Sequence, residues 1–118
     1  MKPKIYEYAK CSTCRKALKF LDARGAAYEA VPIVETPPSK AELREMLKRV
    51  GSLKKLFNTS GELYRELKVS EKLPKMSEDA ALELLSKHGK LVKRPFALVG
   101  DKGLVGFDEA QWAAAFPK

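Results

Sequence analysis

Long apolar runs, histidine and cysteine are all scarce in this chain of 118 residues, which contains one histidine and two cysteines. No apolar stretch approaches the roughly 20 residues that a membrane-spanning helix needs. The opening MKPKIYEY also lacks the apolar segment of a signal peptide. These absences predict a cytoplasmic protein with no membrane partner, in which a close cysteine pair is catalytic, redox-sensing or metal-binding rather than structural.

Acidic residues are fewer than basic ones: 15 Asp/Glu stand against 23 Lys/Arg, a formal net charge of +8. The excess is largest in residues 1–24, with seven basic and two acidic residues, and is absent from residues 77–118, with six of each. Direct nucleic-acid binding would call for a dense basic stripe with base-reading side chains, and no helix-turn-helix or zinc-finger pattern occurs. We therefore expect no direct nucleic-acid partner and interpret the excess as a solubilising surface that attracts small anions.

Hydrophobic spacing and turn residues predict the element order strand, helix, strand, several helices, strand, strand, helix. Residues 5–10 alternate as a short strand that ends at the cysteines, and a helix follows as far as Gly25. Residues 27–34 predict an edge strand, because Pro32 cannot donate to a ladder. The runs PFALV and GLVGF, joined by GDKG, predict a closing hairpin, and a last helix begins at Asp108.

The segment between the second and third strands is predicted to be helical. Ser39 opens a capping box, Gly51 and Gly89 are expected to end two of its helices, and Ser77 caps the second of these. Pro74 interrupts the helical pattern between them.

We therefore predict a single α/β domain over residues 1–118, with a helical insertion at approximately 39–89. The first strand-helix-strand forms a right-handed parallel unit, and the hairpin pairs against it. The result is a mixed four-stranded sheet flanked by helices.

Two cysteines lie three residues apart where the first strand gives way to the first helix, in the sequence AKCSTCRKA. Residues i and i+3 on a first helical turn share one face, at a separation that a disulfide can span. The free N–H groups of that turn stabilise a thiolate, and Lys10 and Arg15 add positive charge. We predict Cys11 as the exposed nucleophile and Cys14, one turn deeper, as the resolving thiol.

Two other interpretations of the cysteines compete with this one. Cys14 alone could be a small core residue. A structural zinc site needs four ligands, and His88 is the only other good candidate, so we expect no metal. His88 is more simply explained as a cation near the last carbonyls of its helix.

Arg94 and Pro95 precede the third predicted strand. A thioredoxin-like fold places a proline there, commonly after a cis peptide bond, facing the cysteines. Pro95 could also be merely a residue that starts a strand. Arg94 would bring a second cation over the thiolate.

The sequence resembles the ArsC/Spx family, which comprises arsenate reductases and Spx-type transcription regulators with a thioredoxin/glutaredoxin-like fold. The resemblance spans essentially the whole chain and is carried by the segments YEYAKCSTCRKALKFL, VETPPSKAEL, LFNTSGELYREL, LVKRPFALV and VGFDEAQW. The most similar pattern is that of small, poorly characterised ArsC-like proteins that contain both CxTCRKA and FNTSG. The resemblance implies the thioredoxin fold with a helical insertion between strands 2 and 3.

The resemblance also implies roles for individual residues. The family's nucleophile falls on Cys11, the arginine of its cysteine loop on Arg15, and the arginine before its proline on Arg94. Substrate and thiol groups are expected to bind at Lys10, Ser12, Thr13, Asn58 and Pro95. Where glutaredoxin-coupled arsenate reductases have further arginines, this chain has Asn58 and Gly106.

Three functions follow from the resemblance, and we rank them by the residues present. A thiol-disulfide oxidoreductase is favoured because Cys14 can resolve an adduct internally. It would have no bound cofactor, would use glutathione as a co-substrate, and would be a monomer coupled to a glutathione/glutaredoxin or thioredoxin system. An Spx-like redox switch that binds the RNA polymerase α C-terminal domain near Gly51 is the alternative. Arsenate reduction ranks third, because two arginines are missing.

Overall fold

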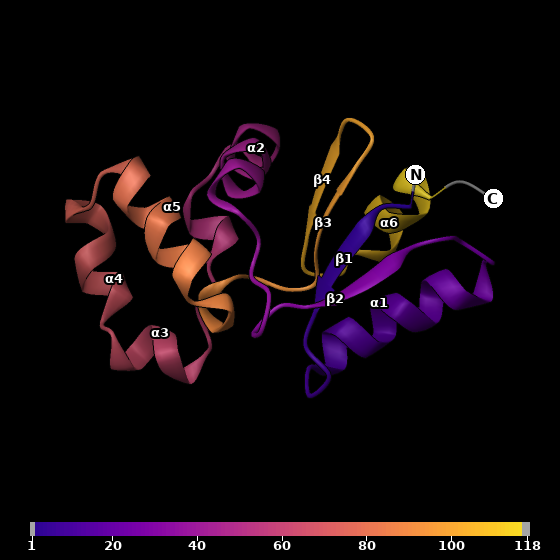
Figure 1. The fold of residues 1–118 in the computed structure, drawn as a ribbon, viewed down its shortest axis with the longest axis horizontal. Coiled ribbons are helices and arrows are strands. Elements are labelled where there is room, and N and C mark those ends of the chain that lie inside the picture. The colour runs from indigo at the N-terminus through magenta and orange to yellow at the C-terminus, as the bar shows by residue number, and fades with distance from the viewer. Residues whose placement is uncertain (1, 117–118) are drawn as a thin grey trace.

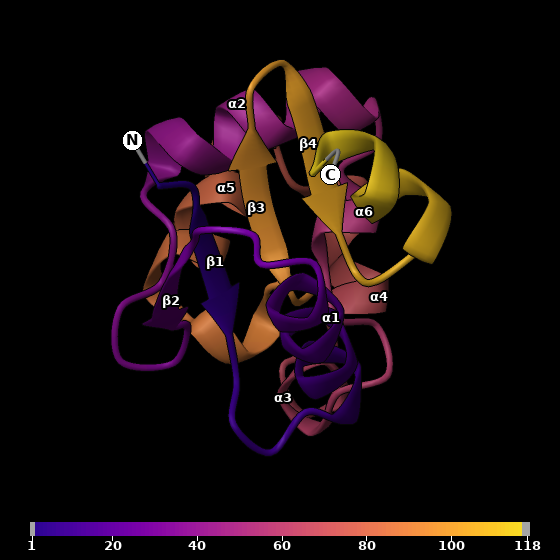
Figure 2. The same cartoon turned by 90° about the vertical axis from the view of Figure 1, so that its right-hand side faces the viewer.

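The protein is described by a computed structural model that covers residues 2–116 in three layers. A central sheet separates helices α1 and α6 on one face from helices α2 to α5 on the other (Figures 1 and 2). The molecule is elongated, 43 × 28 × 23 Å, because the insertion extends it to one side of the sheet. This is the α/β architecture predicted from the sequence.

The sheet has four strands in the order β2-β1-β3-β4, so β2 and β4 form its edges. β1 pairs parallel with β2, while β3 pairs antiparallel with both β1 and β4, and the sheet is therefore mixed, as predicted. The bounds are β1 Lys4–Glu7, β2 Glu29–Pro32, β3 Phe96–Val99 and β4 Lys102–Val105. Pro32 ends an edge strand, where the sheet does not need the N–H group that proline lacks.

One long helix follows β1, and most of the other helices lie between β2 and β3, where the insertion was predicted. The α-helices are α1 Ser12–Ala23, α2 Lys40–Val50, α3 Glu62–Glu66, α4 Val69–Lys72, α5 Glu78–Lys87 and α6 Glu109–Ala115. Short 3₁₀ helices span Lys54–Leu56 (η1), Leu73–Lys75 (η2) and Gly89–Leu91 (η3).

The predicted helix ends are set by local hydrogen bonds. Ser39 forms a capping box with Glu42 at the start of α2, and Gly51 ends that helix at φ 76°. Ser77 caps α5 and Asp108 caps α6, each through its side-chain oxygen.

Alternation along β1 divides the interior into two apolar clusters. Ile5 packs with Leu21 and Trp112 in the layer formed by α1 and α6. Tyr6 faces the opposite side and packs with Phe96 and the helices of the insertion. Because both faces of the sheet are covered, the ends of its strands are held in fixed positions.

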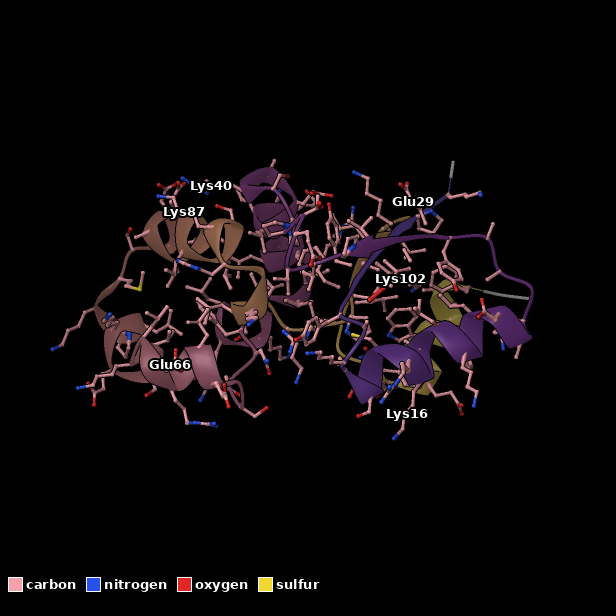
Figure 3. The ribbon with its side chains drawn as sticks, turned by 60° about the horizontal axis from the view of Figure 1, so that its bottom comes forward. Lys16, Glu29, Lys40, Glu66, Lys87 and Lys102 are labelled. Atoms are coloured by element: carbon pink, nitrogen blue, oxygen red, sulfur yellow. The ribbon has the colours of Figure 1, made fainter. Side chains whose placement is uncertain are left out.

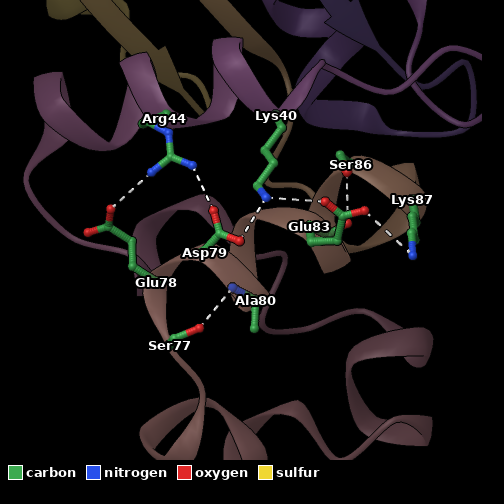
Figure 4. Close-up of polar contacts among 9 residues, drawn as sticks. All are labelled: Lys40, Arg44, Ser77, Glu78, Asp79, Ala80, Glu83, Ser86 and Lys87. Carbon is green, nitrogen blue, oxygen red and sulfur yellow. Dashed lines mark hydrogen bonds and ion pairs between the residues drawn. The ribbon is translucent and has the colours of Figure 1, made fainter.

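Helices α2 and α5 are also joined by exposed ion pairs (Figure 4). Lys40 contacts Asp79 and Glu83, at 2.8 and 3.3 Å, and Arg44 contacts Asp79 at 2.9 Å. Solvent screens such pairs, so the buried clusters contribute more to holding these helices together. Figure 3 shows that Lys40 and Lys87 lie on the outer side of this layer, away from the sheet.

Two local expectations are corrected by the structure. The first strand ends at Glu7 rather than at the cysteines, because Tyr8 to Lys10 form a turn closed by the Cys11 N–H on the Tyr8 carbonyl at 2.9 Å. Helix α5 ends at Lys87 with His88 as its C-cap, so Gly89 is not its terminator. Gly89 instead lies against the backbone of Ile33 with no room for a β-carbon.

None of the helices within residues 2–116 is both long enough and apolar enough to cross a membrane.

Candidate active site

Cys11 lies at the point where the turn after β1 leads into α1. It is the N-cap residue of that helix, with extended backbone angles (φ −94°, ψ 116°). Its Sγ accepts a hydrogen bond from the Cys14 backbone N–H at 3.4 Å, a place that a serine or aspartate oxygen takes in most helices. A thiolate at this position is stabilised, because the N-terminal end of the helix dipole is positive.

The two thiols differ in exposure and acidity. Cys11 is half-buried, whereas Cys14 is only 1% exposed. Partial burial acts to raise the pKa of Cys11, but hydrogen bonds from the Cys14 thiol and backbone N–H and from Arg94 outweigh it, so the pKa is lowered. Burial raises the pKa of Cys14 to about 12, and the hydrogen bond and charge of Cys11 act in the same direction. At neutral pH the outer sulfur is therefore the more readily ionised.

Arg94 is the cation that reaches the outer thiol. Its guanidinium carbon lies 4.8 Å above the centre of the Tyr8 ring, and its Nη1 donates to the Lys90 carbonyl oxygen at 3.2 Å. The Arg94–Pro95 peptide bond is cis, as the family resemblance implies. Stacking on Tyr8 and the bond to Lys90 together hold the guanidinium in place beside Cys11.

An open pocket of about 650 Å³ surrounds the Cys11 side. It brings together six of the predicted site residues: Lys10, Cys11, Ser12, Thr13, Asn58 and Arg94. Cys14 and Pro95 are buried and are not among the lining residues. The pocket can therefore admit a thiol or disulfide group to Cys11 while Cys14 stays behind it.

Arg15 lies apart from the other predicted site residues. It is exposed on α1 and does not line the pocket, and its backbone N–H donates to the Cys11 carbonyl oxygen at 3.1 Å. The groups that lower the pKa of Cys11 include Arg94 but not Arg15. The cation that supports the thiol therefore comes from the segment before β3.

Tyr8 and Lys93 are among the lining residues that sequence reasoning did not assign to the site. Tyr8 could have been inferred from its position three residues before Cys11, but its place under a guanidinium from residue 94 depends on the pairing of β1 with β3. Lys93 adjoins Arg94 and adds a second cation from the same segment.

Asn58 and Gly106, which replace family arginines, both line the pocket. Arg94 is the one arginine among the described residues that line this pocket. A doubly charged oxyanion would find few charge-assisted donors here.

Residues 2–116 contain no cluster of three or more His, Cys, Asp or Glu side chains arranged to hold a metal ion.

Replacing Arg94 with leucine is expected to raise the pKa of Cys11, because burial then acts against fewer hydrogen bonds. A charge-assisted hydrogen bond contributes about 1.5–3 kcal/mol, so we expect alkylation of Cys11 at neutral pH to slow by at least about tenfold. Iodoacetamide modification followed by peptide mapping across pH measures this. The pH at which the alkylation rate of Cys11 is half-maximal should be lower in the wild type than for an ordinary thiol. In Arg94→Leu this midpoint should be higher than in the wild type.

Arg15→Leu is the matched control, since it removes an equal charge from the same neighbourhood. Its Cys11 midpoint should stay close to wild type. A larger shift for Arg15→Leu than for Arg94→Leu would contradict the assignment of Arg94 as the stabilising cation.

The comparisons with known proteins agree with this geometry. A family model described as the ArsC family matches residues 6–115. YusI of Bacillus subtilis, an uncharacterized protein, is 51% identical over 109 residues, which cover 92% of this chain and 92% of YusI. An arsenate reductase of Neisseria meningitidis serogroup A is 34% identical over 105 residues, 87% of this chain and 88% of the relative. An ArsC family related protein from Bacteroides fragilis superposes with a TM-score of 0.91 at 42% identity and 98% coverage of both chains.

Proposed function

This chain belongs to the ArsC family, and from that membership we propose that it is a thiol-disulfide oxidoreductase with Cys11 as nucleophile and Cys14 as resolving thiol. The proposal is carried by one observation. Two thiols lie at one helix N-terminus, with Cys11 as the N-cap on the pocket wall and Cys14 buried one turn behind it. This placement lowers the pKa of Cys11 and raises that of Cys14. A dithiol enzyme needs this difference, because one sulfur must react with substrate while the other waits as a neutral thiol.

In the first step the Cys11 thiolate attacks one sulfur of a substrate disulfide. A bond forms between Cys11 Sγ and that sulfur, the substrate S–S bond breaks, and the other half leaves as a thiolate that takes a proton from solvent. Arg94 and the first-turn N–H groups of α1 stabilise the attacking anion. The product is a mixed disulfide on Cys11.

In the second step Cys14 attacks Cys11 Sγ, and its proton passes to the thiolate that leaves. The mixed disulfide breaks, the second half of the substrate leaves as a thiolate, and Cys11 and Cys14 become an internal disulfide. Burial is the main cause of the high pKa of Cys14, and the hydrogen bond and charge of Cys11 add to it. The contribution from Cys11 disappears once Cys11 is in a mixed disulfide, so adduct formation itself makes Cys14 easier to ionise.

The cycle moves two electrons from the protein to the substrate, and an external thiol must return them. Two molecules of glutathione, or one dithiol protein of the thioredoxin or glutaredoxin kind, supply them by the reverse exchange. The cations Lys10, Lys93 and Arg94 on the pocket wall are suited to the carboxylates of glutathione.

Arsenate reduction is the less favoured activity. Although a relative at 34% identity is an arsenate reductase, Asn58 and Gly106 stand on this pocket wall in place of two family arginines. A disulfide carries no charge at its reacting atoms, so the lack of those guanidinium groups costs it little.

A turnover assay tests the proposal. With glutathione as reductant, the mixed disulfide of glutathione and 2-mercaptoethanol should be reduced many times per protein molecule, and arsenate at least about tenfold more slowly, since a lost charged hydrogen bond costs about 1.5–3 kcal/mol. Oxidation that stops after one event per chain would instead support an Spx-like redox switch. Its predicted partner, the RNA polymerase α C-terminal domain, would then be sought by comparing the oxidised and reduced forms.

A further inference from the structure

A second pocket, of about 720 Å³, lies between the C-terminal end of α2, η1 and β4. We call it the basic groove and define it by its four cations, Arg49, Lys54, Lys55 and Lys93. Its other described lining residues are apolar or uncharged, so no carboxylate faces the cations from its walls. The groove therefore has a net positive field.

Most of this charge is uncompensated. Arg49 is paired with Glu45 at 2.9 Å, and its Nη1 also donates to the Lys102 carbonyl oxygen. Lys54, Lys55 and Lys93 are exposed and form no ion pair within residues 2–116. An anionic ligand would meet three cations whose charge the protein itself does not neutralise.

The basic groove adjoins the pocket of Cys11, because Lys93 and Val105 line both. Another pocket adjoins the Cys11 pocket and shares Tyr8 and Arg94 with it. Its charges are mixed, because the carboxylates of Glu62 and Glu66 stand beside Lys90 and Arg94. A chain that leaves the Cys11 pocket thus meets cations alone in the basic groove and charges of both signs in this other pocket.

We propose that the basic groove binds an acidic peptide segment next to the reacting cysteine of a disulfide-bonded protein substrate. The inference rests on the proposed exchange reaction, which places a substrate cysteine against Cys11. Extended chain advances about 3.3–3.6 Å per residue, so the residues flanking that cysteine must cross the adjoining surface. A nucleic acid fits less well, because a phosphate backbone longer than the groove would meet Asp108, Glu62 and Glu66 in the adjoining pockets, whereas an acidic peptide segment can be confined to the groove.

Exchange kinetics with designed peptides test the groove. Each peptide carries one cysteine in a mixed disulfide with 2-mercaptoethanol, flanked by four glutamates, four serines or four lysines. We expect the full-length protein to react fastest with the glutamate peptide, by about tenfold over the serine peptide at low salt, and slowest with the lysine peptide. The preference should shrink as salt is added, because the cations are exposed.

Lys54→Ala/Lys55→Ala is the test variant, and Lys72→Ala/Lys75→Ala is the matched control with the same loss of charge far from the groove. The ratio of glutamate to serine rates should fall severalfold in the first variant, since two of the three uncompensated cations are removed, and should stay at the wild-type value in the second. Equal rates for all three peptides with the wild type would overturn the inference. An equal fall of the glutamate-to-serine rate ratio in both variants would also overturn it.

Two further outcomes separate the inference from its premise. If the protein fails to react with the small mixed disulfide of glutathione and 2-mercaptoethanol, the proposed function fails rather than the groove. If a single-stranded oligonucleotide blocks the groove at salt concentrations where the glutamate peptide shows no advantage, the groove is a nucleic-acid site and the peptide proposal is wrong.

Discussion

Cys14→Ser is expected to accumulate one glutathione per chain on Cys11 when the protein is mixed with oxidised glutathione. The nucleophile is intact in this variant, and a serine hydroxyl cannot attack the adduct, so the reaction stops after its first step. Wild type should instead pass through the adduct to an internal disulfide with no bound glutathione. Intact-mass spectrometry under non-reducing conditions distinguishes the two products, because the variant gains the mass of one glutathione and the wild type does not.

Cys11→Ser is the counterpart that tests the order of the two thiols. It should neither form an adduct nor turn over, because the remaining sulfur is buried and burial is the main cause that raises the pKa of Cys14. Equal labelling of the two variants by glutathione would show that the thiols are interchangeable, and the assigned roles would then be wrong. Loss of labelling in Cys14→Ser would equally contradict the assignment.

The chemistry of the thiol pair could be predicted because it depends on residues that are close together in the sequence. A spacing of three residues at the start of a helix places Cys11 at the N-cap and Cys14 one turn on, whatever the rest of the fold does. The direction of each pKa shift follows from that placement, since the outer sulfur meets free N–H groups and the inner one faces the core.

The surroundings of the thiol were harder to predict because they come from distant parts of the chain. Arg15 is close in sequence, yet its side chain is exposed on α1, while Arg94 reaches Cys11 because β3 pairs with β1. Tyr8 could not be placed either, since alternation continued the first strand through it whereas the chain turns there. Neither position is fixed by local propensity.

Gly89 shows that the fold, like the site, depends partly on local sequence and partly on contacts between distant segments. A glycine after an amphipathic helix predicts a left-handed C-cap, and that prediction holds for Gly51 at φ 76°. At Gly89 a glycine is required for a different reason, because the Ile33 carbonyl oxygen occupies the place that a β-carbon would take. Sequence reasoning identified the glycine but not its cause, because the contact joins residues that follow β2 and α5.

Gly89→Ala is therefore expected to destabilise the protein by about 3 kcal/mol, since the new methyl group overlaps backbone that cannot rotate away. That loss corresponds to a fall in Tm of roughly 10 °C for a domain of this size. Gly100→Ala is the matched control: it has a positive φ of 58° and open space around it, so it should cost only about 1 kcal/mol of backbone strain. Thermal unfolding followed by circular dichroism measures both.

The substitution should also affect the thiol, because Gly89 begins η3 and η3 leads directly to the segment that carries Arg94. If Ile33 and Gly89 must separate, the Lys90 carbonyl that holds the Arg94 guanidinium moves with them. We therefore expect the Cys11 alkylation midpoint to rise in Gly89→Ala and to stay unchanged in Gly100→Ala, at a temperature where both are folded. A destabilised Gly89→Ala with an unchanged midpoint would show that Arg94 is positioned by Tyr8 alone.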